Sequence, residues 1–585
     1  MKVAPVVPSA PPKPRDEIYK PKGGVRKPYK NVVPLIHSTL TEGAARRFAA
    51  SSARMFHGDN PQVALPRMLS QKQMARLQAG VEQRSRAIRA FMKDYFGKGK
   101  QKVIPEEVMC GILNRHHLSG ISHWIRRKDI NHMSGTDVVN GPDGRPKAIE
   151  DNPGYVGGPG DALVAKKAAL DLIPGLKDVT EDLDPMTFYQ SMVDQARKRC
   201  KGGEVIMLSY GRGSASDHEE VRLARIMKKL GVDTLSLDAW EHDQRYGRWL
   251  EAGRNGVFIR ERSGEKTKVG YILSNVESHD LDPHHKSVRD AATWNLASDK
   301  IGELETQQKK RGLSPAMVTT LDQLRAMVAG DEQGQVEYKG LRKFYKASFP
   351  DDYEAWQYEG VKGLLDAYYN KKVGLSNPPG TDSWIGDKEF YNHVPKLIEH
   401  YLGEKPIIEN IPSRSFRTFS GKKAVADESV FAGTFAAGAR EGLVIKRVDG
   451  RGGDAVWVGP KTSEEVWQGL QEQIRRHPAL YIVQEYMPLS RVDGMLVDMR
   501  LINHVWGKKV QTMPYPWARA TPDLEGGDGK VNLSLHGAGG EQAVFVARKP
   551  KGVTRKQPAE AVPSLATTRE RRDNPDYRPY KLRRV

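Results

Sequence analysis

A short acidic stretch, residues 132–152, constrains the fold more than any other part of the sequence. It reads HMSGTDVVNGPDGRPKAIEDN, and the NGPDG turn separates two runs that alternate like β-strands. Alternation places Glu150 and Asn152 on one face, and pairing across the turn would bring Asp137 beside them. Mg²⁺ prefers such oxygen donors, so Asp137, Glu150 and Asn152 are candidate metal ligands. Taken alone, however, the local pattern favours a polar hairpin with one solvated face.

The composition of the chain fits a soluble protein with several domains. The sequence has 585 residues, 38% of them hydrophobic, which predicts three or four domain-sized units with substantial cores. Its formal net charge of +20 indicates an acidic partner, namely nucleic acid, anionic lipid or a phosphorylated substrate, unless the excess lies in the tails. The two cysteines form no CxxC pair, and we find no signal peptide and no membrane-length apolar run. These features predict a cytoplasmic location without membrane association.

Both ends of the chain are basic and poor in apolar residues, which predicts flexible segments over residues 1–36 and 548–585. In the second segment, Tyr577 and Tyr580 are interleaved with basic residues, a composition that could bind a polyanion weakly. A tail that only improves solubility is the alternative, and the composition favours it slightly.

Two central stretches have distinct patterns. Residues 186–283 contain the strand EVIMLSY, a polar turn and the helix-like EVRLARIMKKLG before another strand. This order predicts an α/β unit with some parallel pairing. Residues 284–360 are highly charged and carry helical periodicity, so we predict a solvated helical insertion without catalytic residues.

A glycine-rich loop lies between two predicted strands near residue 450. The strand GLVIK carries Lys446, and the loop DGRGGDA that follows contains Gly450, Gly452 and Gly453. Glycine lets backbone amides approach phosphate closely, so the loop predicts a lid over phosphates, with an ordinary glycine hairpin as an equal alternative. Lys388 opens an amphipathic helix upstream, where it could reach a phosphate or be a surface residue.

Further candidate binding residues follow the glycine loop. The strand YIVQEYMP ends in Gln484, Glu485 and Tyr486, where backbone groups and a carboxylate could hold adenine and ribose. In LVDMRLINHVW, Arg500 shares a strand face with Asp498. The stretch KVNLSLHGAGGE places Asn532 before a last glycine loop.

The order of these pieces resembles the circularly permuted ATP-grasp family, whose members include glutathionylspermidine-synthase-like amide ligases. In an ordinary ATP-grasp enzyme the lysine and glycine-loop lobe comes first, the adenine hinge follows, and the metal-binding Asp…Glu-x-Asn comes last. Here Asp137…Glu150-Asp151-Asn152 comes first, and GDKEFYNHVPKLIEHYLGEKP, VIKRVDGRGG, YIVQEYMP, VDMR and VNLSLHGAGG follow. The resemblance covers roughly residues 56–283 and 360–547, and it favours the metal site over the solvated hairpin.

The resemblance implies an α+β fold of the α/β type with a pre-ATP-grasp domain. The units it implies, together with the segments above, are a flexible basic arm (1–36), a permuted ATP-grasp lobe with the metal-binding hairpin (56–185), a pre-ATP-grasp-like domain (186–283), a helical insertion (284–360), ATP-grasp lobes with the glycine loop and adenine hinge (361–547) and a basic tail (548–585).

The resemblance also implies an activity. The protein would be an ATP- and Mg²⁺-dependent ligase that joins a carboxylate to an amine, such as a peptide-type substrate, through an acyl-phosphate intermediate. Site roles follow residue by residue: Mg²⁺ ligands Asp137, Glu150 and Asn152; nucleotide contacts Lys388, Lys446, Gly450, Gly452, Gly453, Gln484, Glu485, Tyr486 and Asn532; catalytic residues Arg500 and Lys446.

Two departures from the family pattern leave alternatives open. Arg447 follows Lys446 where the family usually has proline, and Asp454 in the lid would repel bound phosphate. An ATP-grasp scaffold without catalysis that binds a polyanion or a partner protein is one alternative. An ATP-grasp phosphotransferase that releases a phosphorylated product is the other.

Overall fold

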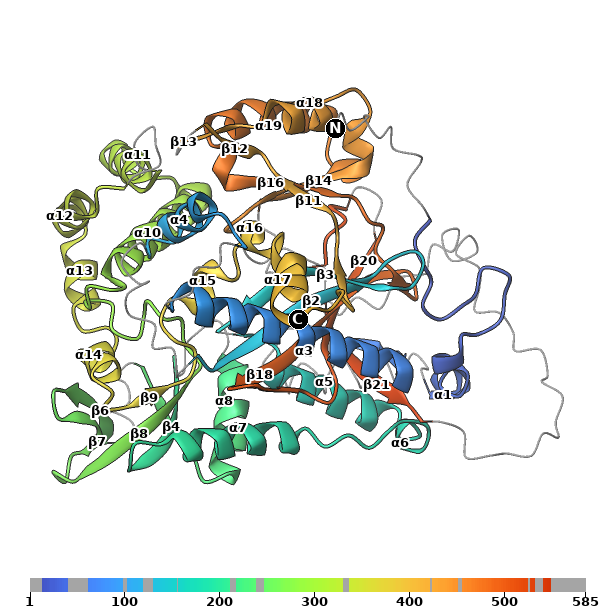
Figure 1. Cartoon of the computed structure of the whole chain (residues 1–585), viewed down its shortest axis with the longest axis horizontal. Helices are drawn as coiled ribbons and strands as arrows, with labels where there is room; N and C mark the ends of the chain where they lie inside the picture. Colours follow the sequence, from blue (N-terminus) through green and yellow to red (C-terminus); the bar gives the residue numbers. More distant parts are fainter. Residues whose placement is uncertain are drawn as a thin grey trace.

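The structure is a computed structural model, shown in Figure 1, and the statements below concern the part of the chain that it describes. The described residues are 13–39, 62–97, 103–118, 130–154, 156–210, 217–237, 247–329, 336–420, 423–450, 455–523, 527–531 and 540–548.

A nine-stranded sheet is built from both ends of the chain. Its strand order is β1-β21-β20-β18-β2-β3-β10, and β17 and β19 pair with β18 at its two ends. The outer pairs β1–β21 and β10–β3 are parallel, and the pairs between them are antiparallel. The strands are β1 (Gln62–Ser70), β2 (His132–Asn140), β3 (Pro146–Pro153), β10 (Glu409–Asn410), β17 (Arg491–Val492), β18 (Met495–Trp506), β19 (Lys509–Thr512), β20 (Trp517–Pro522) and β21 (Gly540–Ala547).

The hairpin predicted over residues 132–152 is present as β2 and β3. Asp137 lies opposite Glu150 in the register, and Asn152 lies opposite Gly135. The register shifts between Asp137 and Val138, which leaves one extra residue in β3 next to Glu150. Such bulges re-aim side chains beside functional sites. The sequence alternation predicted the hairpin, but it carried no sign of the bulge.

Two helices cover opposite faces of this sheet. In α3 (Gln71–Tyr95), which begins with a capping box between Ser70 and Gln73, an apolar stripe packs against Leu69 and its neighbours. The helix α5 (Pro159–Leu172) packs against Met68 and Phe545. Because successive side chains of a strand point to opposite faces, Met68 and Leu69 place the two helices on opposite sides. Burying each large apolar side chain contributes about 1.5–3 kcal/mol.

A second sheet follows the expected α/β pattern. Its order is β5-β4-β8-β7-β6, with β9 added beside β8, and β4 is parallel to both β5 and β8. The elements are α7 (Met186–Arg199), β4 (Glu204–Ser209), α8 (Asp217–Lys229), β5 (Asp233–Ser236), β6 (Arg248–Gly253), β7 (Gly256–Glu261), β8 (Lys266–Ser274) and β9 (Gly374–Leu375).

A third, smaller sheet carries the predicted strand–loop–strand unit, and we call it the small sheet. Its order is β11-β16-β14-β15, and two helices pack on its core around Ile445, Phe431 and Trp467. It lies at the top of Figure 1. Its elements and the ribbon beside it are β11 (Ser413–Ser415), β12 (Arg417–Ser420), β13 (Lys423–Ala426), α18 (Glu428–Thr434), η3 (Ala439–Gly442), β14 (Leu443–Arg447), β15 (Val456–Val458), η4 (Gly459–Lys461), α19 (Glu464–Arg476), η5 (Pro478–Leu480) and β16 (Tyr481–Glu485).

The charged stretch expected to be helical contains four helices with a core of their own, drawn in green in Figure 1. They are α10 (Arg289–Arg311), α11 (Pro315–Ala329), α12 (Tyr338–Ser348) and α13 (Pro350–Trp356). The remaining short helices are η1 (Lys27–Tyr29), α1 (Val33–Thr39), α4 (Glu106–Arg115), α6 (Leu176–Val179), α14 (Leu364–Tyr369), α15 (Thr381–Trp384), α16 (Lys388–Tyr391) and α17 (Val394–Leu402). None of the helices in the described segments is long and apolar enough to cross a bilayer.

The expectation of a flexible N-terminal arm is wrong for residues 13–36. Ile18, Tyr29 and Val33 are buried in the core beneath α5, and the Tyr29 hydroxyl accepts a hydrogen bond from the backbone of Met68. The basic and proline-rich composition hid these spaced apolar residues. Residues 1–12 lie outside the described part of the chain, as do all residues of the predicted tail except Arg548.

A buried ion pair fixes the N-terminal segment. Glu17 accepts two hydrogen bonds from the Arg67 guanidinium at 2.6 and 2.9 Å, and others from Asn140 and Ser490. Burial alone would raise the pKa of Glu17, but the charge and hydrogen bonds of Arg67 outweigh it and lower that pKa. Because Asn140 ends β2, this contact ties the N-terminal segment to the acidic hairpin.

We predict that Glu17→Ala lowers the free energy of unfolding by about 3–5 kcal/mol, because it leaves the fully buried Arg67 without a counter-charge. Denaturant unfolding measures this loss. Asp143→Ala is the matched control, since its exposed pair with Arg145 should contribute less than about 1 kcal/mol. A similar loss in both variants would contradict the assignment.

Candidate functional site

Three charged side chains and one tryptophan form a row across four neighbouring strands of the nine-stranded sheet. Glu150 on β3 lies opposite Asp137 on β2, Asp137 opposite Arg500 on β18, and Arg500 opposite Trp517 on β20. Directly opposed residues share a face, so these four side chains lie on one side of the sheet. A Cβ at Gly135 would lie 2.7 Å from Cδ of Arg500, so the missing side chain leaves room for the arginine.

Two arginines hold the buried carboxylate of Asp137. Arg500 donates to both oxygens of Asp137 at 2.6 and 2.9 Å, and Arg519 donates to Oδ2 at 3.0 Å. Arg519 also forms a bidentate pair with Asp498, and both guanidinium groups lie over the Trp517 ring. Asp137 is only 1% exposed, which makes this network part of the sheet core as well as part of the candidate site.

Two lysines reach the same acidic hairpin from other elements. Lys388 of α16 lies 3.6 Å from Glu150 and donates to the carbonyl of Gly450. Lys446 of β14, on the small sheet, lies close enough to Glu150 and Asp137 for their charges to act on its pKa. Burial and the charge of Lys388 lower the pKa of Lys446 to about 8, against the attraction of the two carboxylates. Lys446 therefore changes its charge close to neutral pH.

Glu150 is the accessible carboxylate of the site. Its side chain is 25% exposed, and it accepts a hydrogen bond from Asn152 at 3.0 Å. Burial would raise its pKa, but Lys388, Arg500 and the bond from Asn152 together lower that pKa below its ordinary range. Glu150 is therefore ionised and faces the cations.

Three further buried carboxyl groups border the row: Asp161, Glu219 and Glu541. Glu219 accepts hydrogen bonds from the backbone amides of Gly158 and Gly160 at 2.8 and 2.9 Å. Burial and the charge of Asp161 raise the pKa values of Glu219 and Glu541 well above the ordinary range, which favours the neutral form of both groups. Asp161 is paired with Arg222 at 3.2 Å. The charges that remain along the row are Lys388, Lys446, Arg500 and Arg519 against Asp137, Glu150 and Asp498. This balance leaves an excess of positive charge, which favours an anionic ligand.

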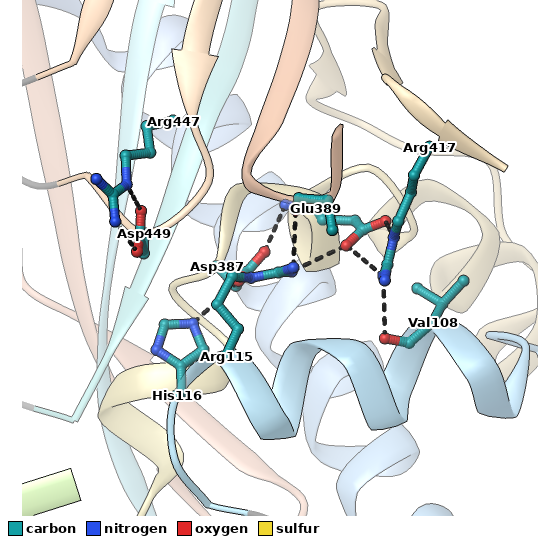
Figure 2. A network of polar contacts seen from close by, with 9 residues as sticks. Val108, Arg115, His116, Asp387, Glu389, Arg417, Arg447 and Asp449 are labelled. Atoms are coloured by element: carbon teal, nitrogen blue, oxygen red, sulfur yellow. Dashed lines mark hydrogen bonds and ion pairs between the residues drawn. The ribbon is translucent and has the colours of Figure 1, made fainter. Parts of the chain in front are cut away.

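Figure 2 shows a separate network that holds α16, the helix of Lys388. Arg115 at the end of α4 donates to Asp387 and to Glu389, which flank Lys388 in the sequence, at 2.9 Å each. Arg417 of β12 forms a second, bidentate pair with Glu389. The backbone at Lys388 is therefore anchored on both sides.

The predicted adenine hinge lies on β16 of the small sheet. The Gln484 side chain is buried and donates to the Ser413 hydroxyl at 2.9 Å, so it has a structural partner. The backbone amides of Glu485 and Tyr486 donate to Pro412 and Gly442, at 2.9 and 2.7 Å. The roles of these three residues toward a nucleotide remain predictions.

The structure brings together five charged residues and one amide singled out from the sequence: Asp137, Glu150, Lys388, Lys446, Arg500 and Asn152. Gly450 is adjacent through its contact with Lys388, whereas Gly452, Gly453 and Asn532 lie outside the described residues. Sequence reasoning missed Arg519 and Trp517. The signal was available, because these residues alternate along the strand WARATP and therefore share a face.

The donor set of the hairpin fits Mg²⁺ in its chemistry. Asp137, Glu150 and Asn152 offer hard oxygen donors, although both oxygens of Asp137 already accept bonds from arginine. In the described segments, no three histidine, cysteine or carboxylate side chains are grouped so that they could hold a metal ion. Proteins usually bind Mg²⁺ through one or two carboxylates together with phosphate oxygens, and this pair is suited to that arrangement.

Comparison with models of known protein families shows which family the chain belongs to. The family model described as circularly permuted ATP-grasp type 2 matches residues 66–291 and 342–518, more than half of the chain. The chain belongs to the circularly permuted ATP-grasp family. The predicted fold class is confirmed, because the mixed α/β sheets agree with that fold. The permuted order is visible in the nine-stranded sheet, where β2 and β3 from the first third of the chain pair beside β18 and β20.

Relatives of this ATP-grasp protein span most of its length. An uncharacterized protein of Mycobacterium tuberculosis is 24% identical, and the alignment covers 94% of this chain and 87% of that protein. A Frankia casuarinae protein, named provisionally as glutamate–cysteine ligase 2-2, is 22% identical over 91% of this chain and 54% of its own length. Among solved structures, a glutathione synthetase-like effector from Globodera pallida matches with 8% identity and a TM-score of 0.48, covering 86% of this chain and 96% of that chain.

We predict that the two hairpin carboxylates differ in their contribution to stability. Asp137→Ala should lower the free energy of unfolding by about 3 kcal/mol, because it leaves the buried Arg500 without its main counter-charge. Glu150→Gln should cost about 1 kcal/mol or less, since that side chain is partly exposed and the glutamine keeps hydrogen-bonding atoms. Chemical denaturation of the two variants checks the difference, and an equal loss would contradict the central position of Asp137.

Proposed function

We propose that the protein is an ATP- and Mg²⁺-dependent ligase that joins a carboxylate to an amine. The observation that carries the proposal is the convergence of Lys388, Lys446, Arg500 and Arg519 on the Asp137–Glu150 hairpin. Phosphoryl transfer needs spread negative charge to be neutralised and the reacting groups to be positioned, with little covalent help from the protein. Membership of the ATP-grasp family and the provisional ligase name of a relative support the proposed ligase activity.

In the proposed reaction, a substrate carboxylate attacks the γ-phosphorus of ATP, forming an acyl-phosphate and releasing ADP. An amine then attacks the acyl carbon, phosphate leaves, and the amine loses a proton to give the amide. Lys388 and Lys446 would bind phosphate oxygens, and Arg500 would steady the carboxylate or the transferred group. Asp137, Glu150 and Asn152 would hold Mg²⁺, which would neutralise phosphate charge. Since Asp137 is already paired, metal binding would require at least one arginine contact to be exchanged.

The remaining nucleotide contacts are proposed from the family pattern. Gly450, Gly452 and Gly453 would cover the phosphates, and Gln484, Glu485 and Tyr486 would line the adenine. Asn532 would join the phosphate side of the site. Amino acids and short peptides are the proposed carboxylate substrates.

We predict that the purified protein consumes ATP in the presence of Mg²⁺ and a matching acid and amine. A screen of amino acids, peptides and polyamines is read by ADP release and by product mass, which for an amide equals acid plus amine minus water. Glu150→Gln should lower turnover by about a hundredfold or more. Glu472→Gln, an exposed carboxylate on α19, is the control and should leave turnover unchanged.

The alternatives give different products in the same screen. Phosphorylated acid that accumulates while the amine stays unconsumed would identify a phosphotransferase. ATP binding without consumption of ATP under any condition would identify a scaffold that has lost catalysis. Either result would overturn the ligase proposal.

The lowered pKa of Lys446 predicts how nucleotide affinity varies with pH. Below about pH 8 Lys446 is protonated and attracts phosphate, and above it the charge is lost. Bound phosphate raises that pKa, so ATP affinity should fall as pH rises beyond about 8. Lys446→Arg keeps its charge and should flatten the fall. Calorimetric titration with ATP between pH 7 and 9.5 checks this, and parallel curves for both proteins would contradict a phosphate contact.

A further inference from the structure

Arg115 connects three parts of the molecule through one guanidinium group. Its Nε donates to Asp387 at 2.9 Å, its Nη2 to Glu389 at 2.9 Å, and its Nη1 to the backbone carbonyl of Ala479 at 2.8 Å. Asp387 and Glu389 flank Lys388, whereas Ala479 lies in η5 immediately before β16 of the small sheet. Figure 2 shows the arginine between the two carboxylates. The side chain of Arg115 is only 6% exposed, so these contacts are shielded from water.

The helix that carries Lys388 depends on such contacts. The helix α16 is a single turn, Lys388–Tyr391, and a helix this short is not stable by itself. Asp387 caps it by accepting a hydrogen bond from the amide of Glu389 at 2.8 Å. His116 lies 3.0 Å from the same carboxylate, and Arg417 pairs with Glu389. Arg115 is the member of this network that bonds to both carboxylates.

Lys388 in turn lies where the nine-stranded sheet meets the small sheet. Its backbone amide donates to Val448 at 2.9 Å and its ammonium group to Gly450, both of which follow β14. The same ammonium group lies 3.6 Å from Glu150 on β3. Displacing α16 would therefore move Lys388 relative to both the hairpin and the glycine loop.

We propose that Arg115 is a positioning residue that sets the location of Lys388 in the nucleotide site and couples it to the small sheet. The inference rests on the proposed function, because it assigns Lys388 to phosphate binding. The hydrogen bonds of Arg115 go to Asp387, Glu389 and Ala479, and it acts on the site through these three residues. Neither lysine nor a shorter side chain can replace this three-way contact, because only guanidinium presents donors in a planar fork.

A double-mutant cycle separates positioning from general stability. ATP affinity is measured by calorimetry for the wild type, Arg115→Lys, Lys388→Ala and the double variant, each with its Tm. We expect Arg115→Lys to weaken ATP binding about tenfold in the wild-type background and to have almost no effect when Lys388 is already alanine. Arg325→Ala, which removes an exposed arginine of the helical insertion, is the control and should leave affinity unchanged in both backgrounds.

A second measurement does not depend on ATP. An amine-reactive reagent labels Lys388, and peptide mass spectrometry measures the rate. This rate should rise several-fold in Arg115→Lys, because contacts with its partners leave Lys388 only 6% exposed in the wild type. Labelling of the exposed Lys509 should not change.

The outcomes separate the two proposals. Equal weakening of ATP binding in both backgrounds, or unchanged labelling of Lys388, would overturn the positioning role while the ligase proposal stands. If the wild type binds no ATP, the proposed function fails, and the positioning role fails with it. Lower Tm with unchanged ATP affinity would show that Arg115 is structural only.

Discussion

The pairing of Asp137 with Arg500 and Arg519 is the interaction on which the rest of the structure depends. Taking these charges out of water costs several kcal/mol for each ion, so the pairing must be geometrically good to be tolerated. The cross-strand register supplies this geometry, because β2, β18 and β20 present their charged residues directly beside one another. The strands come from distant parts of the sequence, so the same network joins the first third of the chain to its last fifth and forms the sheet side of the candidate site.

Lys388 and Lys446 are positioned by other elements than the arginines. The arginines are rigidly placed by strands of the nine-stranded sheet, whereas Lys446 belongs to the small sheet and Lys388 to a one-turn helix between them. The full set of cations therefore exists only when the two sheets are correctly docked. The raised pKa values of Glu219 and Glu541 favour their neutral forms, which limits the negative charge beside this set. In the proposed function, nucleotide binding and sheet docking would depend on the same contacts, including the buried hydrogen bonds of Arg115 and Arg417 that hold α16.

The sequence predicted local features well and long-range ones poorly. Period-two alternation around the NGPDG turn was sufficient to place Asp137 beside Glu150, since both residues belong to one hairpin. The bulge next to Glu150 and the bonds of Arg115 have no local signature, because they arise from partners in β2 or hundreds of residues away. Composition misled at residues 13–36, where prolines and lysines concealed Ile18, Tyr29 and Val33. The proposed roles of the site residues came from the family resemblance, because spacing alone does not assign them.

Circular permutation has different consequences for the two kinds of contact at this site, those across the strands and those made by α4. Moving a chain terminus changes the loops that join strands, but it leaves the side chains that face one another across a ladder unaffected. The row from Glu150 through Asp137 and Arg500 to Trp517 depends only on register, so it tolerates a different chain order. The hydrogen bonds from Arg115 to the residues on either side of Lys388 depend instead on a helix, α4, that lies outside the sheets. Such supporting contacts differ in sequence position from the motifs they serve, and only packing in three dimensions reveals them.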